Sequence, residues 1–299
     1  MVEIVQIMKQ YPFLLSVIIV NYNSADYVVD CLDSIFRNCS HLSLQLIVVD
    51  NASPDNGQLV IAKRYGERIE MIESTYNRGF GGACNLGLER ATGQYILFLN
   101  PDTVLLNDAF SPLVSYAEHY PDTALGAILL NADHQPSNSY SSFLTPWNIL
   151  LSALGYHGNV HYKEVLRPLS VDFITGADLF VSHEIMDRIG GFDERFFMYC
   201  EDVDLQKRMA DAGIRRLIVP GPQIVHYDGG SYQQKKKRSA RRRYEADKSK
   251  MIYVKKHYSL SVYLCFRLLF LLVRIPACIN PYYKVRDNLQ YLSLLLRTI

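Results

Sequence analysis

The sequence predicts an α/β fold in which a mostly parallel central sheet is flanked by helices, and three observations support this prediction. Short apolar runs rich in β-branched residues alternate with segments of helical periodicity up to about residue 130. The first two runs end in polar, turn-forming residues, as buried parallel strands do at the edge of a sheet. With 299 residues, the chain can also bury a substantial core in one large domain or two small ones.

Strands and helices alternate along the first part of the chain. The expected elements are, in order, a strand over 15–20, a helix through 28–36, a strand over 44–49, a helix over 59–65 and a strand over 69–72. Asn23 or Ser24 is placed to cap the first helix. This alternation is typical of a doubly wound sheet, whose parallel strands end at one common edge.

A glycine-rich loop follows the third expected strand. Gly79, Gly81 and Gly82 open a helix that we expect to run to about Ala91. Glycine lets the backbone approach a ligand closely, and a helix N-terminus favours anions. The segment does not fit GxxxxGK[ST] and does not follow the first strand, which excludes the P-loop and the dinucleotide fingerprint.

The most informative stretch is GQYILFLNPDTV, residues 93–104. Its apolar run ends abruptly at Asn100-Pro101-Asp102, which predicts a buried strand that delivers a carboxylate to the sheet edge. Open α/β sheets bind ligands at that edge, and Mg²⁺ or Mn²⁺ prefers oxygen ligands that it can share with phosphate. Asp102 is therefore a candidate metal ligand, and a plain turn is the alternative.

Beyond residue 130 the pattern becomes irregular. Residues 131–170 combine Trp147 with prolines, serines and asparagines, which suits an acceptor-site loop region or an ordinary surface insertion. The expected elements are a helix around 149–154, a strand over 173–182 with a turn at Gly176-Ala177-Asp178, a helix over 183–189, a helix ending at Ala212 and strands over 214–219 and 224–226.

Acidic residues gather among aromatic residues where the helix that ends at Ala212 begins. Glu201, Asp202 and Asp204 lie in its first turn. Acids at this position often stabilise the helix by interacting with the positive end of its macrodipole. Acids beside aromatic rings can instead carry the raised pKa that a general base requires. His226 follows a short apolar run and is either a hydrogen-bonded surface histidine or a metal ligand.

Seven blocks in this order resemble the family 2 inverting glycosyltransferases, especially the bacterial rhamnosyltransferase-like branch that builds surface polysaccharides. The blocks are SVIIVNYNS (16–24), LIVVDNAS (46–53), NRGFGGACNLG (77–87), YILFLNPDT (95–103), ITGADLFV (174–181), GGFDERFFMYCEDVDL (190–205) and IVHYDGGS (224–231). The likeness covers residues 14–232 and implies a GT-A fold, with a Rossmann-like nucleotide-binding half over 14–130 and an acceptor half over 131–232. Together residues 1–232 would form one glycosyltransferase domain.

The resemblance also implies roles for individual residues. The nucleotide would be bound by Asn21, Tyr22, Asn23, Asp50, Asn77, Arg78, Gly79, Asn85 and Asn100, with Asp50 accepting the imino hydrogen of the base. Asp102 and His226 would hold Mn²⁺ or Mg²⁺. Asp202 matches the catalytic base, a role that Glu201 could share or replace, and Gly176, Ala177 and Asp178 would contact the acceptor or the sugar.

The implied activity is transfer of a sugar, such as rhamnose, from a nucleoside-diphosphate donor to a lipid-linked or growing surface-polysaccharide acceptor. A single in-line displacement inverts the anomeric centre and needs one base. The first acid of the family's DXD-type motif is Asn100 here, so the alternative is a catalytically degenerate nucleotide-sugar-binding module. A sugar-nucleotide pyrophosphorylase is disfavoured, because it would want a lysine-containing glycine loop where this chain has Asn21-Tyr22-Asn23.

Residues 233–299 form a basic, amphipathic helical extension. The chain carries a net charge of +1, yet residues 235–256 alone carry +9. The apolar run 260–275 contains Arg267 and Arg274 and falls short of the roughly 20 apolar residues of a spanning helix. We expect an interfacial helix that places Leu264, Phe266, Leu268, Leu271 and Leu272 in the lipid boundary, with peripheral membrane contact; a packed helical hairpin is the alternative. No stacking motif supports nucleic-acid binding.

Cysteine usage and the N-terminus bear on location. The six cysteines show no CxxC spacing, and we interpret them as reduced thiols. No cleavable signal peptide is evident. The sequence therefore predicts a cytoplasmic protein at the inner face of the cytoplasmic membrane.

Overall fold

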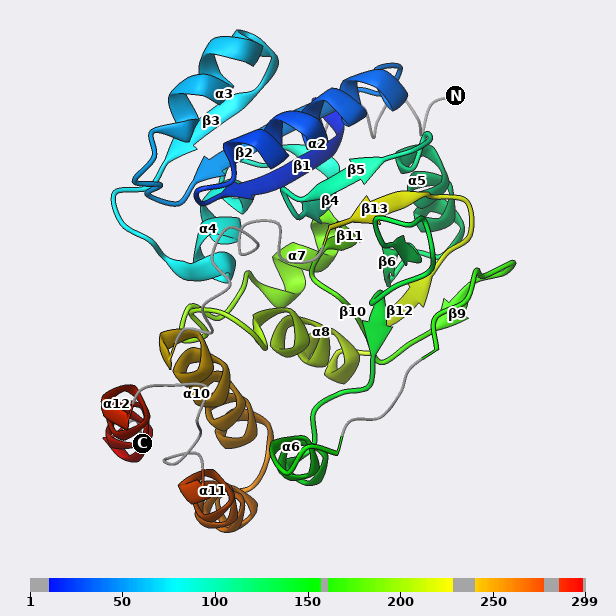
Figure 1. Ribbon diagram of the computed structural model, residues 1–299. Helices are drawn as coiled ribbons and strands as arrows, with labels where there is room; N and C mark the ends of the chain where they lie inside the picture. Colours follow the sequence, from blue (N-terminus) through cyan, green and yellow to red (C-terminus); the bar gives the residue numbers. More distant parts are fainter. Residues whose placement is uncertain (1–10, 157–160, 228–239, 277–284, 298–299) are drawn as a thin grey trace.

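The computed structural model describes residues 11–156, 161–227, 240–276 and 285–297. A large twisted sheet occupies the centre, helices cover both of its faces, and the C-terminal helices lie beside one another at one end (Figure 1). The remaining residues, which include the last part of the 224–231 block, the lysines and arginine at 235–238 and Cys278, lie outside the described residues.

The elements follow the expected order along the chain. The strands are β1 (Phe13–Asn21), β2 (Leu44–Asp50), β3 (Glu70–Glu73), β4 (Gly93–Leu99), β5 (Thr103–Leu105), β6 (Thr123–Gly126), β7 (Leu129–Leu130), β8 (Tyr140–Ser141), β9 (Leu169–Ser170), β10 (Phe173–Ile174), β11 (Asp178–Ser182), β12 (Arg215–Ile218) and β13 (Ile224–His226). The helices are α2 (Ala25–Asn38), α3 (Gly57–Tyr65), the 3-10 helix η1 (Gly66–Arg68), α4 (Gly79–Leu88), α5 (Phe110–His119), α6 (Pro146–Ala153), α7 (His183–Ile189), α8 (Glu201–Asp211), α10 (Ala240–His257), α11 (Leu260–Arg274) and α12 (Val285–Arg297).

The large sheet has the strand order β3-β2-β1-β4-β11-β6-β12-β9. β3, β2, β1 and β4 are parallel, which confirms the expected parallel half. β11 is antiparallel to β4 and to β6 and lies between them. Because β11 runs in the opposite direction, it begins at the edge where β1, β2 and β4 end. Segments from both halves of the chain therefore meet at one edge of a continuous sheet.

The strand expected over 173–182 is divided at the expected turn, and its two parts belong to different sheets. Phe173–Ile174 (β10) pairs with β8 in a separate sheet, whereas Asp178–Ser182 (β11) pairs with β4 in the large sheet. Asp178, expected in the turn, is instead the first residue of β11 and is fully buried. Apolar periodicity identifies both strands but does not show that the chain changes sheets between them.

Two helix ends also differ from expectation. Ser24 precedes α2, yet its hydroxyl donates to Asn21 Oδ1 at 3.0 Å and makes no side-chain cap bond to the helix. The helix opened by the glycines ends at Leu88 rather than near Ala91, because Arg90 and Ala91 N–H groups bond to Gly87 and Leu88 carbonyls in a turn.

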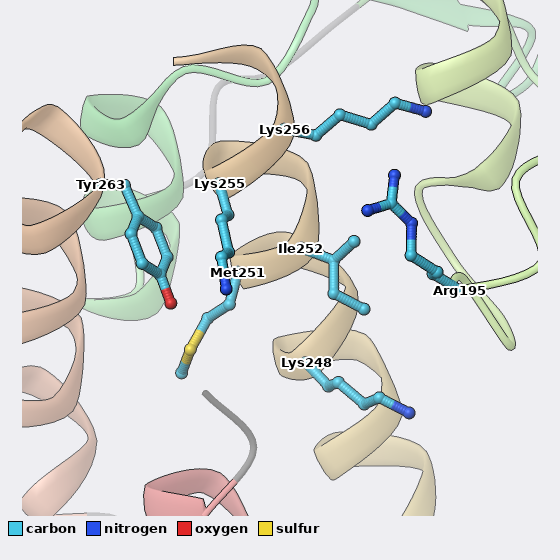
Figure 2. A pocket seen from close by; sticks show the side chains of 7 residues that line it. All are labelled: Arg195, Lys248, Met251, Ile252, Lys255, Lys256 and Tyr263. Carbon is cyan, nitrogen blue, oxygen red and sulfur yellow. The ribbon is translucent and has the colours of Figure 1, made fainter. Parts of the chain in front are cut away.

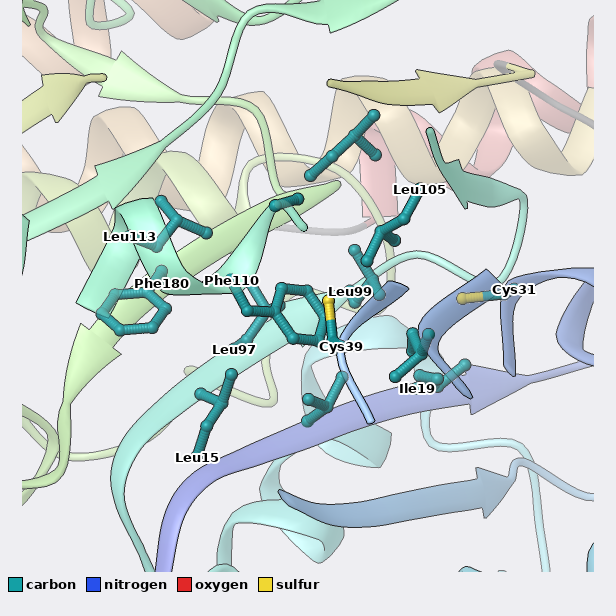
Figure 3. Packing of buried hydrophobic residues seen from close by; sticks show 14 of the residues in the cluster. Leu15, Ile19, Cys31, Cys39, Leu97, Leu99, Leu105, Phe110, Leu113 and Phe180 are labelled. Atoms are coloured by element: carbon teal, nitrogen blue, oxygen red, sulfur yellow. The ribbon is translucent and has the colours of Figure 1, made fainter. Parts of the chain in front are cut away.

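The core lies on both faces of the sheet. Leu15 and Ile19 of β1 pack on one face with Phe110 of α5 and Phe180 of β11 (Figure 3). Ile18, between them in sequence, points to the other face and packs in the second cluster, which includes residues of α4 and α8. β1 is thus buried on both faces, which explains its continuous run of apolar residues.

A third cluster joins the C-terminal helices to the rest of the molecule. It contains Phe196, which precedes α8, together with Tyr253 of α10, Phe266 of α11 and Tyr291 of α12. The expectation that Phe266 contacts lipid is wrong: this side chain is 2% exposed and stacks on Phe270 at 5.3 Å. The packed-helix alternative therefore describes this face of α11.

The opposite face of α11 remains open to solvent. Leu264, Leu268 and Leu272 are each more than half exposed, whereas Leu271 is partly buried. Within the described ranges, none of the helices is both long enough and apolar enough to cross a membrane.

Candidate active site

A polar cluster forms where β1 and β2 end. Asn21 and Asp50 lie opposite each other in the parallel register, and Asn21 Nδ2 donates to Asp50 Oδ1 at 2.7 Å. Both side chains are buried. Ser53 fixes the pair, since its N–H donates to Asp50 Oδ2 at 3.0 Å and its Oγ accepts from Asn21 at 3.2 Å. Asn23 N–H also donates to Ser53 Oγ, while Tyr22 is 42% exposed beside them.

Asn51, which the sequence analysis did not single out, joins the end of β2 to the glycine-rich loop. Its Nδ2 donates to Asn77 Oδ1 at 3.1 Å and to the Gly79 carbonyl at 3.0 Å. Its Oδ1 accepts from the Arg78 N–H at 2.8 Å. Three expected nucleotide-binding residues are therefore held next to Asp50. The available signal was the position of Asn51 directly after a strand end.

The space that a side chain would need at these glycines is filled by other parts of the protein. Gly79 has φ +77°, and a Cβ built on it would lie 1.9 Å from the Phe197 carbonyl oxygen. Phe80 N–H donates to that same oxygen at 3.1 Å. A Cβ on Gly81 would lie 2.8 Å from Phe192 Cβ. These positions need glycine because the segment before α8 packs against the start of α4.

Asn85 bonds to the segment before α8 rather than to the cluster formed by Asn21, Asp50 and Ser53. Its Nδ2 donates to the Phe192 carbonyl at 2.9 Å, and its Oδ1 accepts from the Phe192 N–H at 2.8 Å. Its Nδ2 also lies 3.3 Å from Glu194 Oε1. In this structure the Asn85 amide holds the segment that leads into α8.

A histidine and a carboxylate meet on the turn after β4. β13 pairs with β5 so that His226 lies opposite Thr103, directly after Asp102. His226 Nε2 lies 3.3 Å from Asp102 Oδ1 and 3.3 Å from Asn100 Nδ2. Asp102 is 6% exposed. The structure thus brings together the two residues expected to hold a metal ion, with Asn100 beside them.

The donor set of this turn suits a metal that is shared with a substrate. In the described part of the chain, no group of three or more His, Cys, Asp or Glu side chains could hold a metal ion. Mg²⁺ is usually bound by one or two carboxylates together with substrate phosphates rather than by an all-protein cage. Asp102 and His226 fit that pattern for Mn²⁺ or Mg²⁺, provided that a diphosphate supplies the remaining oxygen ligands.

The two acids at the start of α8 have different surroundings. Asp202 is half-buried, and its carboxylate accepts from the Gly176 N–H at 3.0 Å and from the Val203 N–H at 2.8 Å. Glu201 is 6% exposed, and its Oε2 has no hydrogen-bond partner among the described residues. Burial raises the pKa of Asp202, and burial together with repulsion from Asp202 raises the pKa of Glu201 well above its ordinary value.

The turn between β10 and β11 connects the turn that carries Asp102 to the start of α8. Asn100 N–H donates to the Ala177 carbonyl at 2.9 Å, and the neighbouring Gly176 N–H donates to Asp202 Oδ2 at 3.0 Å. Two adjacent residues therefore touch both the turn that carries Asp102 and the helix that carries Asp202. Asp178 is the third residue that was expected to contact the acceptor or the sugar. Its side chain is buried and accepts a hydrogen bond from the Ala127 N–H, and burial raises its pKa well above the ordinary value.

Replacing Glu201 with glutamine is expected to stabilise the protein above about pH 4.5. The raised pKa means that stability is full below the ordinary value of 4.5 and is lost as pH rises toward the folded value. The amide removes that loss, so the difference in Tm between variant and wild type should grow from pH 4 to pH 8. Glu184→Gln, an exposed acid in the first turn of α7, is the matched control. A Glu201→Gln protein less stable than wild type at pH 8 would contradict this account.

On the far side of α8, Asp204 anchors the C-terminal extension. It is fully buried, and its carboxylate lies 2.7 Å from Lys256 Nζ, 2.8 Å from His257 Nε2 and 3.1 Å from Arg208 Nε. Lys256 also pairs with Asp193 at 2.7 Å. The helix that presents Asp202 is therefore fixed to α10 by buried ion pairs.

Solved structures with this architecture define the fold. The chain aligns with the mannosyltransferase PcManGT from Pyrobaculum calidifontis, solved with GDP-Man and Mn²⁺, at a TM-score of 0.56 and 17% identity, over 96% of this chain and 86% of that one. It aligns with GalNAc-T7, solved with UDP, GalNAc and Mn²⁺, at a TM-score of 0.61 and 14% identity, over 95% of this chain and 55% of that one. The protein has the GT-A fold.

Comparison of the amino-acid sequence with known protein families identifies the family of this chain. Residues 16–177 match Glycosyl transferase family 2, so the chain belongs to that family and is a glycosyltransferase. It is 29% identical over 223 residues to the rhamnosyltransferase WbbL of Escherichia coli K12, covering 71% of this chain and 82% of that one. It is 25% identical over 243 residues to the N-acetylglucosaminyl-diphospho-decaprenol L-rhamnosyltransferase of Mycobacterium tuberculosis H37Rv, covering 73% and 77%.

Proposed function

We propose that this protein is a metal-dependent inverting glycosyltransferase that transfers a sugar from a nucleoside-diphosphate donor to a lipid-linked glycan. The observation that carries the proposal is the Gly176-Ala177 pair, which bonds Asn100 on one side and Asp202 on the other. These two bonds link the turn that carries Asp102 to the helix that carries Asp202, and this link supports the proposal. Family membership and the names of the relatives support the reaction class.

Each group at the edge has a part in such a transfer. Asp50, held by Asn21 and Ser53, offers a fixed acceptor to the base of the nucleotide. Asp202, with its raised pKa, accepts the proton of the acceptor hydroxyl as that oxygen attacks the anomeric carbon. The bond to the nucleoside diphosphate breaks in the same step, which inverts the configuration and requires no second carboxylate nucleophile. We assign the proton transfer to Asp202 rather than to Glu201, because the Asp202 carboxylate is oriented by the Gly176 and Val203 N–H groups whereas Glu201 Oε2 has no hydrogen-bond partner among the described residues.

Asp102 and His226 would hold the divalent cation, with the amide of Asn100 next to them. A bound cation supplies Lewis-acid stabilisation of the negative charge that develops on the departing diphosphate.

The relatives suggest both substrates. Two of them are named as rhamnosyltransferases, and one is named for an acceptor on diphospho-decaprenol. We infer that a deoxyhexose such as rhamnose is transferred and that the acceptor is membrane-bound. The exposed leucines of α11 provide a face that could rest on a bilayer, which we place at the inner side of the cytoplasmic membrane.

Replacing Asp102 with asparagine is expected to abolish the gain in donor affinity that Mn²⁺ provides. Loss of a direct metal ligand should reduce metal affinity by at least the roughly 10- to 100-fold that loss of an outer-shell partner causes. The measurement is the thermal shift produced by a panel of nucleoside-diphosphate sugars, each with and without Mn²⁺, since a donor raises the Tm by mass action. The panel also identifies the donor.

Asp187→Asn is the matched control, because Asp187 forms an exposed carboxylate–histidine pair with His183 at 3.8 Å. This variant should respond to Mn²⁺ as the wild type does. An unchanged metal response in Asp102→Asn would remove Asp102 from the metal site. If the protein bound the donor but neither transferred nor hydrolysed it with any metal, it would be a degenerate binding module. The neutral Asn100, in place of the first acid of the motif, favours that alternative.

A further inference from the structure

A basic cavity lies between the C-terminal helices and the segment that leads into α8. It has a volume of about 310 Å³ and is lined by residues of α10, by Tyr263 of α11 and by Arg195 (Figure 2). Its charged lining consists of Arg195, Lys248, Lys255 and Lys256. The charged groups that line it all carry the same sign, which suits an anion.

Nearby carboxylates pair with three of the four cations that line this cavity and leave one of them without such a partner in the described part of the chain. Lys256 and Arg195 share Asp193, and Lys256 also pairs with Asp204. Lys248 lies 3.6 Å from Glu245. Lys255 is exposed and has no carboxylate within ion-pair distance among the described residues; its ammonium lies 5.8 Å from the centre of the Tyr263 ring. Lys255 therefore supplies a charge that the described residues leave uncompensated.

Tyr263 provides a second, independent observation that indicates a bound ligand. The residue is only 3% exposed, and its hydroxyl is buried without a hydrogen-bond partner in the described part of the chain. Figure 2 shows its ring directed from α11 toward α10, with the hydroxyl on the side of Met251 and Lys255. A buried hydroxyl left unpaired costs free energy, so a ligand that accepts its hydrogen bond would be favoured here.

The surroundings of the cavity indicate the kind of anion. α11, which supplies Tyr263, exposes Leu260, Leu264 and Leu268 at four-residue spacing, and these side chains therefore share one side of the helix. Arg195 lies on the segment that continues directly into α8 and Asp202. A phosphate held in the cavity thus lies between α11, which carries this apolar stripe, and Lys256, which pairs with Asp204 of α8.

We propose that this cavity binds the phosphate or diphosphate group of a lipid, with Lys255 and Tyr263 as its direct ligands and the α11 leucines beside its hydrocarbon chain. The proposal rests on the proposed function, since it gives the lipid-linked acceptor a place next to the catalytic helix. The leucine face favours a lipid over free phosphate, because a soluble anion gains nothing from exposed leucines.

The test measures binding of the full-length protein to vesicles by co-sedimentation. Phosphatidylcholine vesicles containing a long-chain polyprenyl diphosphate are compared with phosphatidylglycerol vesicles of equal surface charge. Lys255→Gln and Tyr263→Phe should each weaken binding to the polyprenyl diphosphate vesicles about 10-fold, the loss expected for a bond to a charged group. Inorganic diphosphate should compete poorly with these vesicles.

Matched controls isolate the cavity. Tyr253→Phe removes another buried hydroxyl that has no partner among the described residues but does not line the cavity, and Lys63→Gln removes an exposed charge from α3. Both controls should bind as the wild type does. Wild-type binding by Tyr263→Phe, or equal binding to both vesicle types, would overturn the proposal, and effective competition by inorganic diphosphate would overturn the lipid source.

The outcome is separable from that of the proposed function. The thermal shift given by the nucleotide-sugar panel reports on the β1–β2 edge and should be unchanged in Lys255→Gln and Tyr263→Phe. Loss of the donor response in wild-type protein would count against the transferase proposal alone, whereas loss of vesicle discrimination would count against the cavity alone.

Discussion

Replacing Asp202 with asparagine is expected to reduce sugar transfer about 10²- to 10⁴-fold while donor affinity changes little. The single oxygen of the amide can keep the hydrogen bond from the Gly176 N–H, although not also the one from the Val203 N–H, and the amide cannot accept the proton of the acceptor hydroxyl. Transfer rates are measured with the donor found by the thermal-shift panel, and donor affinity is measured by the same shift. A large loss of donor affinity would reassign Asp202 to donor binding.

The pH profile gives a second reading of the same residue. Burial raises the pKa of Asp202 above its ordinary value of 3.8, so kcat/KM should fall on the acid side at a pH above 3.8 as the carboxylate becomes protonated. Asp202→Asn should lose this acid limb. Asp211→Asn, an exposed acid at the end of the same helix, should keep both the rate and the limb.

Replacing Asp204 with alanine is expected to lower the free energy of unfolding by about 3–5 kcal/mol, the cost of breaking a buried ion pair from one side. Asp204 is fully buried between Arg208, Lys256 and His257, and its loss leaves the buried cations without their shared carboxylate. Urea unfolding followed by circular dichroism measures the change. Asp211→Ala, which breaks the exposed pair with Lys207, should cost about 0–1 kcal/mol.

The dependence of this effect on pH has a definite sign. Burial alone would raise the pKa of Asp204, but hydrogen bonds from His257 and Lys256 and the nearby charges of Lys256 and Arg208 outweigh it and lower the pKa overall. The stability that Asp204 contributes is therefore present above its ordinary value of 3.8 and is lost as pH falls further. A difference between Asp204→Ala and wild type of less than 1 kcal/mol at pH 7 would show that α10 does not depend on this carboxylate.

The polar cluster at the ends of β1 and β2 could be predicted from local patterns. Asn21 and Asp50 each end an apolar run, and parallel strands bring such ends to one edge, so their contact follows from periodicity alone. The meeting of Asp102 with His226 does not follow in this way. It depends on pairing between β5 and β13, which are three-residue strands far apart in sequence, and only the family resemblance indicated it.

Other features had no sequence signal of their own. Asn85 lies on the helix opened by the glycines, but which side of that helix faces the segment before α8 depends on tertiary packing. The sequence does not distinguish Asp204 from the other acids in the first turn of its helix, because its partners Lys256 and His257 lie some fifty residues away. Phe266 has the pattern of a lipid-facing residue, and it is buried by tertiary packing in the third cluster, which also contains residues of α6 and α10.

The place of β11 has a consequence for how the chain acquires its structure during synthesis. β4 and β6 are made early, yet the strand that fills the space between them is complete only when residue 182 has left the ribosome. Until then β4 keeps one edge unpaired, and unpaired strand edges invite association with other chains. A fragment that stops at residue 130 should therefore aggregate instead of folding on its own, and the residues before and after that point would then fold as a single unit.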